Sequence, residues 1–153
     1  MPDPFCYYLR VRYAECDAQQ VVFNSRYVDY VDAAMTEFTR VIWGDYNDLL
    51  ARGIDNQVVH LSIDWKAPAR FDEVVAITVT PARIGDSSYT LRVDFYSHAS
   101  DRHLATAEVV YVMVNAETFD KIRIPDNMRE SLEEGAPGVR VDHAGAGLGT
   151  GAP

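Results

Sequence analysis

The chain has 153 residues, of which 48% are hydrophobic and 24% are charged. These values are ordinary for a globular protein, and the length is enough for one domain with its own hydrophobic core. The net charge of −9 argues against a nucleic-acid-binding protein. No apolar run approaches the roughly 18 residues that a membrane-spanning helix needs, so we expect no membrane insertion.

The N-terminal sequence and the two cysteines favour a reducing, cytoplasmic setting. Residues 1–4 lack the charged-then-apolar layout of a signal peptide. Cys6 and Cys16 are too far apart for a C-x-x-C motif, and no Cys/His pair has the spacing of a zinc site. Glu15 and Asp17 flank Cys16 and oppose a thiolate there. We therefore expect reduced thiols, no metal site and a cytoplasmic protein.

The first third of the chain predicts one strand followed by one long helix. Apolar residues alternate with polar ones from Tyr7 to Tyr13, which is the pattern of a strand. Between Tyr27 and Ile42 the apolar residues recur at helical spacing, and Gly44 is placed to end this helix. The apolar stripe comprises Tyr27, Val31, Ala34, Met35, Phe38 and Val41, and the opposite face carries Asp29, Asp32, Thr36 and Arg40. A short second helix is expected over residues 46–52.

The middle of the chain predicts four strands separated by turn residues. They cover Gln57–Lys66, Val74–Ile84, Ser88–Ser97 and His103–Asn115. Pro81 indicates an edge or a bulge in its strand, and the apolar run 105–114 indicates a strand buried on both faces. Strands joined by tight turns are antiparallel. We therefore expect an α+β domain over residues 1–134, in which five antiparallel strands pack on one long helix.

Two further expectations concern the rest of the chain and its assembly. A short helix is predicted at Asp126–Glu133. From Gly135 onward the chain is mostly Gly, Ala and Pro, so residues 135–153 are expected to form a flexible tail that cannot offset its ordering entropy. A single helix covers only one face of the sheet, which favours a homo-oligomer.

The segment around Asp17 carries the pattern that favours chemistry. A polar loop leaves the first strand and leads into the start of the long helix near Asn24 or Ser25. Backbone N–H groups at a helix start lack partners and carry partial positive charge. Acyl transfer uses such donors to stabilise an oxyanion, while a carboxylate attacks or activates water. The same spacing also fits an Asx turn at Asp17 and an ordinary N-cap at Asn24 or Ser25.

Two segments resemble the hot-dog-fold acyl-CoA thioesterases, in the branch of 4-hydroxybenzoyl-CoA thioesterase and YbgC. Residues 65–72 are similar to that family's Y-x-A-P-A-R-x-D segment. The residues that match the family's signature around its catalytic aspartate are, in order, Asp17, Gln20, Val21, Val22, Phe23, Asn24 and Tyr27. The resemblance runs from about Tyr7 to Leu132. It implies a five-stranded antiparallel sheet wrapped around the central helix.

This resemblance implies roles for particular residues. Asp17 would act as nucleophile or general base, with a backbone N–H near Asn24 as the oxyanion donor. Tyr13 matches a tyrosine just upstream that is often in the site. Asn24 stands where relatives have His or Tyr, and Gln20 replaces the commoner Gly. Met35 stands where many relatives have Arg, so the substrate stays open.

The expected substrate is an acyl-CoA held between two chains of a homodimer or homotetramer, with no cofactor besides the coenzyme A of the substrate. Lys66, Arg70, Arg83 and Arg123 are candidate contacts to its phosphates, and only Arg70 lies in a motif. His60 is a candidate wall of the acyl site. The residues expected to bind substrate are therefore Val22, Phe23, Tyr27, His60, Lys66 and Arg70.

His60, Ser62 and Asp64 lie on one face of a strand and look like a catalytic triad. Same-face neighbours along a strand are about 6.5–7 Å apart, too far for direct hydrogen bonds. A polar strand face explains them better. Asp32 and Glu37 on the long helix are the alternative catalytic acids, because a related hot-dog branch places its acid on this helix.

Three other functions fit the same fold. A hydratase of enoyl thioesters usually needs a His with an acid, and no His occurs between Tyr7 and Arg52. A non-catalytic acyl-CoA or lipid-binding module stays open because of Gln20, Asn24 and Met35. A thioesterase for acyl carrier protein is disfavoured, since the acidic chain would repel an acidic carrier.

Overall fold

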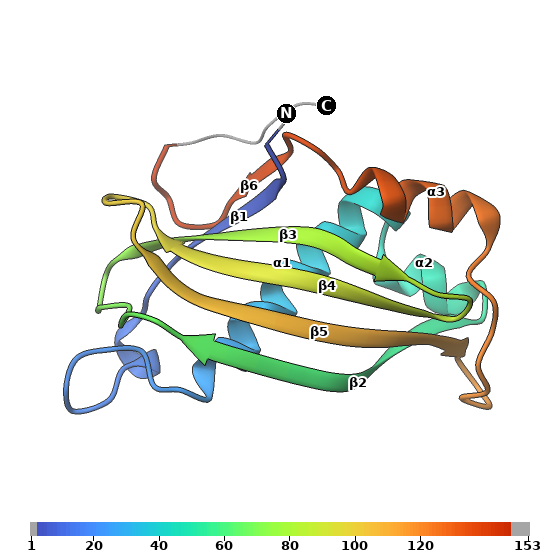
Figure 1. Cartoon of the computed structure of the whole chain (residues 1–153), viewed down its shortest axis with the longest axis horizontal. Helices are drawn as coiled ribbons and strands as arrows, with labels where there is room; N and C mark the ends of the chain where they lie inside the picture. Colours follow the sequence, from blue (N-terminus) through green and yellow to red (C-terminus); the bar gives the residue numbers. More distant parts are fainter. Residues whose placement is uncertain (1–2, 148–153) are drawn as a thin grey trace.

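The structure, a computed structural model, describes residues 3–147. A sheet of six strands curls around one long helix, in the strand order β2-β5-β4-β3-β1-β6 (Figure 1). The elements in chain order are β1 (Phe5–Arg10), the 3-10 helix η1 (Tyr13–Glu15), α1 (Arg26–Trp43), α2 (Tyr46–Ala51), β2 (Ile54–Trp65), β3 (Val74–Ile84), β4 (Ser88–Ser97), β5 (His103–Asn115), α3 (Asp126–Glu134) and β6 (Arg140–Asp142). The predicted antiparallel sheet around one long helix is therefore present, with a short sixth strand added.

The long helix α1 buries the stripe that its sequence predicts, except at the last turn. Tyr27, Val31, Ala34, Met35 and Phe38 are all buried against the sheet, and Tyr30 joins them. Val41 is 43% exposed, whereas Ile42 packs partly against the core. After residue 38, the buried stripe continues four residues later, at Ile42, and not three residues later, at Val41. An α-helix has 3.6 residues per turn, so residues three or four positions apart can both lie on one face. Gly44 ends the helix with a φ of +91°, as predicted.

The strand β1 is shorter than its alternating pattern suggests. It ends at Arg10, and Tyr13 lies in η1 with 82% of its surface exposed, so the prediction of a strand through Tyr13 is wrong. The Arg12 N–H donates to Glu15 Oε1 at 2.8 Å, and this local bond turns the chain out of the sheet. Further along, β3, β4 and β5 have the predicted bounds, and a bulge follows Pro81 as predicted.

The two faces of the sheet differ because α1 covers only one of them. The other face, here called the outer face, carries cross-strand rows of polar residues. One row crosses β2, β5, β4 and β3 and consists of Ser62, Glu108, Arg92 and Thr80. The strand β5 is paired on both edges, but Glu108 is exposed. The prediction that β5 is buried on both faces is therefore wrong.

Residues 135–147 form an ordered extension of the sheet and not a flexible tail. The strand β6 pairs in parallel with β1, next to which it lies in Figure 1. The Cys6 N–H donates to the Val139 carbonyl at 3.0 Å, and the His143 N–H donates to the Tyr8 carbonyl at 2.9 Å. Val139 is buried in the main core. The predicted domain end at residue 134 is wrong for this reason, while residues 148–153 of the predicted tail lie outside the described residues.

The two sides of the sheet differ in whether another strand covers the edge. β6 covers the β1 edge, whereas β2 is an edge strand of 12 residues with no neighbour on its outer side in the described chain. Val58, Val59 and Trp65 on β2 are 51%, 59% and 48% exposed. A long edge strand with exposed apolar side chains favours pairing with another chain. Between residues 3 and 147, no helix is long and apolar enough to cross a membrane.

Candidate active site

The segment between η1 and α1 is a tight loop centred on Asp17. The Asp17 N–H donates to the Val21 carbonyl at 3.0 Å, and the Gln20 N–H donates to the Asp17 carbonyl at 2.9 Å. Gln20 adopts a left-handed φ of +64° to close this turn. Glycine adopts that conformation without steric cost, which explains why Gly is the commoner residue at this point of the family signature. Gln20 therefore closes this turn in a backbone conformation that costs a residue with a side chain some strain.

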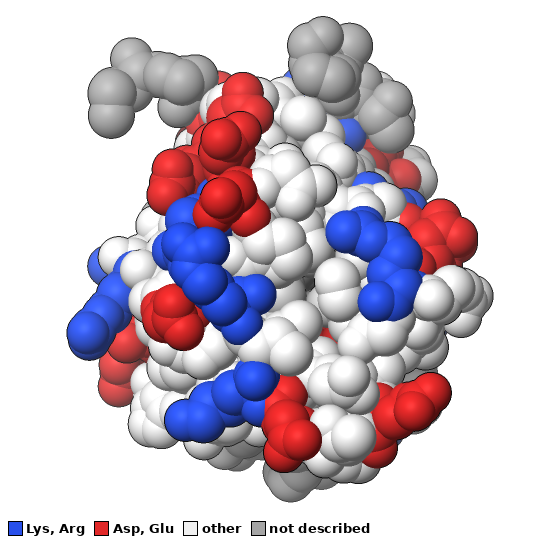
Figure 2. Space-filling model, turned by 90° about the vertical axis from the view of Figure 1, so that its right-hand side faces the viewer, with Lys and Arg blue, Asp and Glu red and all other residues white. Residues whose placement is uncertain are grey.

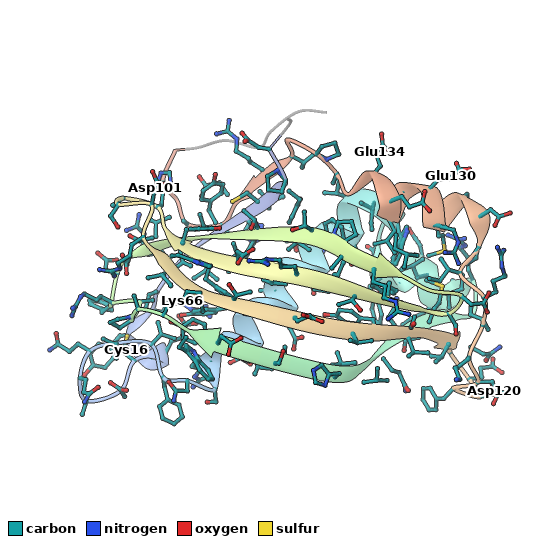
Figure 3. The ribbon with its side chains drawn as sticks, viewed as in Figure 1. Cys16, Lys66, Asp101, Asp120, Glu130 and Glu134 are labelled. Carbon is teal, nitrogen blue, oxygen red and sulfur yellow. The ribbon has the colours of Figure 1, made fainter. Side chains whose placement is uncertain are left out.

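The two segments that carry the family resemblance lie side by side in space. The Val22 N–H donates to the Ala69 carbonyl at 2.9 Å, and the Phe71 N–H donates to the Gln20 carbonyl at 3.2 Å. These bonds attach the Asp17 loop to the connection between β2 and β3. Figure 3 shows Cys16 in the loop and Lys66 at the end of β2 at the same end of the molecule. The second motif therefore positions the first.

A buried glutamate, Glu15, anchors the start of the loop. Its carboxylate accepts hydrogen bonds from the Arg12 N–H at 2.8 Å, the Arg12 guanidinium at 2.8 and 3.1 Å, and the Tyr30 hydroxyl at 2.9 Å. Its carbonyl accepts from the Phe23 N–H at 2.9 Å. Burial opposes ionisation of Glu15, but the hydrogen bonds from Arg12 and Tyr30 outweigh it and lower its pKa.

Sequence reasoning missed the role of Glu15. The available signal was the Arg12-x-x-Glu15 spacing, which is that of a capping box with an unusual first residue. The partner Tyr30 is 15 residues away on α1 and could not be paired with Glu15 from the sequence. Glu15 thereby connects η1, the Asp17 loop and the long helix.

The Asp17 carboxylate has one oxygen in a turn and one oxygen without a protein partner. The Gln19 N–H donates to Oδ1 at 2.8 Å, which is the Asx turn that the spacing allowed. In the described chain, the other oxygen accepts no hydrogen bond. Asp17 lines a hollow of about 600 Å³, here called the Asp17 hollow, together with Tyr13, Cys16, Ala18, Gln20 and Phe71. The Asx turn therefore leaves Asp17 available for chemistry.

A second hollow, here called the helix-start hollow, lies beside the N-terminus of α1. It measures about 290 Å³ and is lined by Val21, Val22, Asn24, Tyr27, Trp65, Lys66, Ala67 and Pro68. The N–H groups of Arg26, Tyr27 and Val28 donate to carbonyls three residues earlier. Those of Asn24 and Ser25 have no acceptor within residues 3–147. These two N–H groups are the candidate oxyanion donors.

The predicted site residues thus fall into three groups. Tyr13 and Asp17 share the Asp17 hollow, whereas Val22, Asn24, Tyr27 and Lys66 share the helix-start hollow. Phe23 and Arg70 are exposed and line neither hollow, although the Arg70 backbone pairs with Val21. In a single chain, Asp17 and Asn24 therefore lie in separate hollows on one loop.

His60 does not face the Asp17 loop. It pairs with Val110 on the outer face, whereas its neighbour Leu61 pairs with the core residue Val109. His60 therefore lines neither hollow, and its expected role as a wall of the acyl site stays a prediction, while its outward position has a local cause. A bulge between Val58 and His60 is the cause, because one extra residue turns every later side chain to the other face.

The alternative acids on α1 lie away from both hollows. Glu37 pairs with Arg40 at 3.2 Å, and its charge acts on Tyr7 of β1. Burial and the nearby Asp29 raise the pKa of Asp32, whose charge acts on Tyr111 of β5. Among the described residues, no group of three acids, histidines or cysteines could hold a metal ion.

An antiparallel sheet curled around one long helix is the arrangement of the hot-dog fold, which solved thioesterase structures share. The sequence model of the thioesterase-like superfamily matches residues 11–132. The chain therefore belongs to this superfamily, which confirms the expected fold class and family.

Individual relatives agree with this assignment. The acyl-CoA thioester hydrolase YbgC of Escherichia coli is 30% identical over 109 residues, which cover 70% of this chain and 79% of YbgC. The crystal structure of a gentisyl-coenzyme A thioesterase is 25% identical with a TM-score of 0.75, covering 83% of this chain and 98% of that one. A protein of Thermus thermophilus is 29% identical with a TM-score of 0.76, covering 85% of this chain and 98% of that one.

Proposed function

We propose that this protein hydrolyses an acyl-CoA thioester to a free acid and coenzyme A, with Asp17 as the reacting carboxylate. The observation that carries the proposal is the free oxygen of Asp17 on a fixed loop that leads to two N–H groups without acceptors in the described chain. YbgC and the gentisyl-coenzyme A thioesterase, both acting on coenzyme A thioesters by name, support the substrate class.

The chemistry follows from the two groups. The thioester carbonyl oxygen would accept hydrogen bonds from the N–H groups of Asn24 and Ser25, which stabilise the negative charge that develops on it. Asp17 would attack the carbonyl carbon, expel the coenzyme A thiolate and form an acyl anhydride that water then hydrolyses. Alternatively, Asp17 would take a proton from a water molecule that attacks the same carbon. A thiolate is a good leaving group, so neither route needs a strong general acid.

A second copy of the chain is part of this proposal. The edge strand β2 begins beside α2 and ends at Trp65, which lines the helix-start hollow and contacts Tyr27. Pairing of two β2 edges would cover Val58, Val59 and Trp65 and bring a second chain to the site. We therefore propose a homodimer, or a homotetramer made of two such dimers.

Substituting Val59→Lys tests this assembly. A charge on an exposed edge strand opposes pairing with another strand, so the variant should be a monomer with strongly reduced hydrolysis. Light scattering at micromolar concentration measures the mass of both proteins. A Phe119→Lys variant, which changes a residue of similar exposure in the turn after β5 and not on β2 itself, should keep the mass of the unmodified protein. An active monomer would contradict the proposal.

The function itself is tested by thiol release from a panel of short, long and aromatic acyl-CoAs. Asp17→Asn keeps the size and can still accept from the Gln19 N–H, but an amide is neither a nucleophile nor a useful base. General-base catalysis is worth about 10²–10⁴-fold, so the rate should fall at least that far. Asp64→Asn is the matched control, because Asp64 is exposed on the outer face and has no partner in the described chain.

The outcomes separate the competing functions. If Asp17→Asn keeps more than about a tenth of the rate, Asp17 is not the catalytic group, and Asp32 is the next residue to replace. Glu37 ranks below Asp32 because Arg40 already pairs with it. If the unmodified protein binds acyl-CoA and hydrolyses none of the panel, it is a binding module.

A further inference from the structure

A third hollow lies on the other side of η1 and is polar. It measures about 380 Å³ and is here called the arginine hollow. It is formed by β1, η1, the first turns of α1 and the segment after β6. Its lining residues are Tyr7, Leu9, Arg10, Arg12, Glu15, Arg26, Asp29, Tyr30, Ala33 and His143. The proposed mechanism uses none of its charged side chains as a reacting group.

Among the residues that line the arginine hollow, three arginines face two carboxylates. Arg12 pairs with Glu15 at 2.8 Å, and Arg26 pairs with Asp29 at 3.2 Å. Arg10 is the third arginine of the hollow, where no third carboxylate is present. The chain as a whole carries a net charge of −9, so a local excess of cations is unusual for it. At the opposite end of the molecule, basic and acidic side chains stand in small mixed groups (Figure 2).

Arg10 is held in place mainly by groups that do not cancel its charge. Its Nε donates to the Ala144 carbonyl at 3.0 Å, and one terminal nitrogen donates to the Asp72 carbonyl at 3.0 Å. The nearest carboxylate, that of Asp72, is 3.6 Å away and largely exposed to water, so this pair is weak. The result is a fixed guanidinium with one terminal nitrogen that has no partner among residues 3–147. Such a fixed donor recognises an anion at little cost in side-chain entropy.

The segment after β6 contributes to this arrangement. It supplies the Ala144 carbonyl that orients Arg10, and it places His143 in the wall of the hollow. The His143 Nδ1 lies 3.1 Å from the Tyr7 hydroxyl, and the two rings contact edge to face. Ordering of this segment therefore completes the hollow.

We propose that the arginine hollow binds a phosphate group, with Arg10 and Arg26 as the cations that the ligand contacts directly. Guanidinium groups match the oxygens of a phosphate with two parallel hydrogen bonds. Three such groups from three elements face one hollow, which fits a group with more than one negative charge. Arg12 has the different task of holding Glu15.

The phosphate has two possible sources, free phosphate and the nucleotide end of coenzyme A. The second source rests on the proposed function. η1 separates the arginine hollow from the Asp17 hollow, since Arg12 and Glu15 line the first and Tyr13 and Cys16 line the second. Coenzyme A is a long molecule with its thiol at one end and its phosphates at the other. If the thioester lies at Asp17 and the phosphates lie in the arginine hollow, the pantetheine arm between them crosses η1.

Direct binding tests the phosphate site without reference to hydrolysis. The probes are inorganic phosphate and adenosine 3′,5′-bisphosphate, which carries the 3′-phosphate and the inner 5′-phosphate of coenzyme A. Calorimetry at low salt measures their binding. Arg10→Gln and Arg26→Gln should each weaken binding about tenfold, because each removes a charge-assisted hydrogen bond. Arg10→Lys should restore part of it. Gln at position 10 can still donate to the Ala144 carbonyl, and thermal unfolding checks that the variant folds.

Arg52→Gln is the matched control, because Arg52 is an exposed arginine at the end of α2 and lines none of the three hollows. It should bind both probes like the unmodified protein. Equal affinity of the Arg10, Arg26 and Arg52 variants, or no binding of either probe, would overturn the phosphate site.

Kinetics with two substrates distinguishes coenzyme A from free phosphate as the ligand of the arginine hollow. If the phosphates of coenzyme A occupy the hollow, Arg10→Gln raises KM for an acyl-CoA about tenfold, leaves kcat unchanged, and leaves KM for the matching acyl-pantetheine unchanged. An unchanged KM for acyl-CoA, with weakened phosphate binding, overturns the coenzyme A source and supports free phosphate. If no thioester is hydrolysed and the bisphosphate still binds through Arg10, the proposed function fails while the phosphate site stands.

Discussion

The Asp17 loop, residues 16–24, and the C-terminal segment, residues 135–147, are both irregular and are both held to the sheet region by backbone hydrogen bonds. They differ in what they leave unpaired. In the part of the chain that the structure describes, the loop keeps one Asp17 oxygen and the N–H groups of Asn24 and Ser25 without partners. The segment uses its backbone to pair with β1 and buries Val139 and Ala144. An irregular segment with free polar groups is poised for chemistry, whereas one with paired groups stabilises the fold.

The largest expected effect on stability comes from the residue that anchors the loop. Glu15→Ala leaves the Tyr30 hydroxyl buried without its acceptor and frees the Arg12 side chain. We expect a loss of about 2–3 kcal/mol in the free energy of unfolding, together with reduced hydrolysis because the Asp17 loop loses its hold on α1. Chemical denaturation and the thiol-release assay measure the two effects.

Glu133→Ala is the control for this variant, because Glu133 is exposed on α3. It should change the free energy of unfolding by less than about 0.5 kcal/mol. If Glu15→Ala behaves like Glu133→Ala, the loop is held by its backbone bonds alone.

A smaller effect is expected in the C-terminal segment. Val139→Ala removes two buried carbon atoms and should cost about 1–2 kcal/mol of unfolding free energy. The hydrolysis rate per folded molecule should stay unchanged, since Val139 lies outside the Asp17 and helix-start hollows. Val41→Ala, at a residue that is 43% exposed, should cost clearly less. Equal costs for the two variants would show that the segment adds little to stability.

The pH dependence of the free energy of unfolding tests how much the charge of Glu15 stabilises the unmodified protein. The folded-state pKa of Glu15 is below its ordinary value of 4.5, so the stability that its charge supplies is complete above that pH. This stability is lost as the pH falls through the lower, folded-state pKa. The difference in unfolding free energy between the unmodified protein and Glu15→Gln should therefore narrow from about pH 6 to about pH 3. A difference that stays constant with pH would mean that the charge of Glu15 does not contribute.

The smallest expected effect is a slight gain in the free energy of unfolding. Gln20→Gly removes the cost of a left-handed side-chain-bearing residue but makes the unfolded chain more flexible. The two changes nearly offset, so we expect the free energy of unfolding to rise by about 0.5 kcal/mol or to stay level. Hydrolysis should be retained, because the turn keeps its shape. A marked loss of stability would show that the Gln20 side chain makes a contact that matters more than the strain.

The sequence by itself determined the elements that depend on neighbouring residues. The bounds of β3, β4 and β5 follow from alternation and turn residues, and α1 follows from the 3.6-residue spacing of its apolar side chains. The motif around Asp17 also identified the family, since the same short segment carries both the turn and the carboxylate that is proposed to react.

Only the tertiary structure decided the features that join distant parts of the chain. The buried bond between Glu15 and Tyr30, and the pairing of the Asp17 loop with Ala69, link segments whose own patterns give no sign of each other. The C-terminal segment has too few large apolar side chains to predict its docking, because backbone hydrogen bonds and small buried groups hold it. His60 faces outward because a bulge of one residue reverses the alternation of β2, and a bulge forms only where two strands pair.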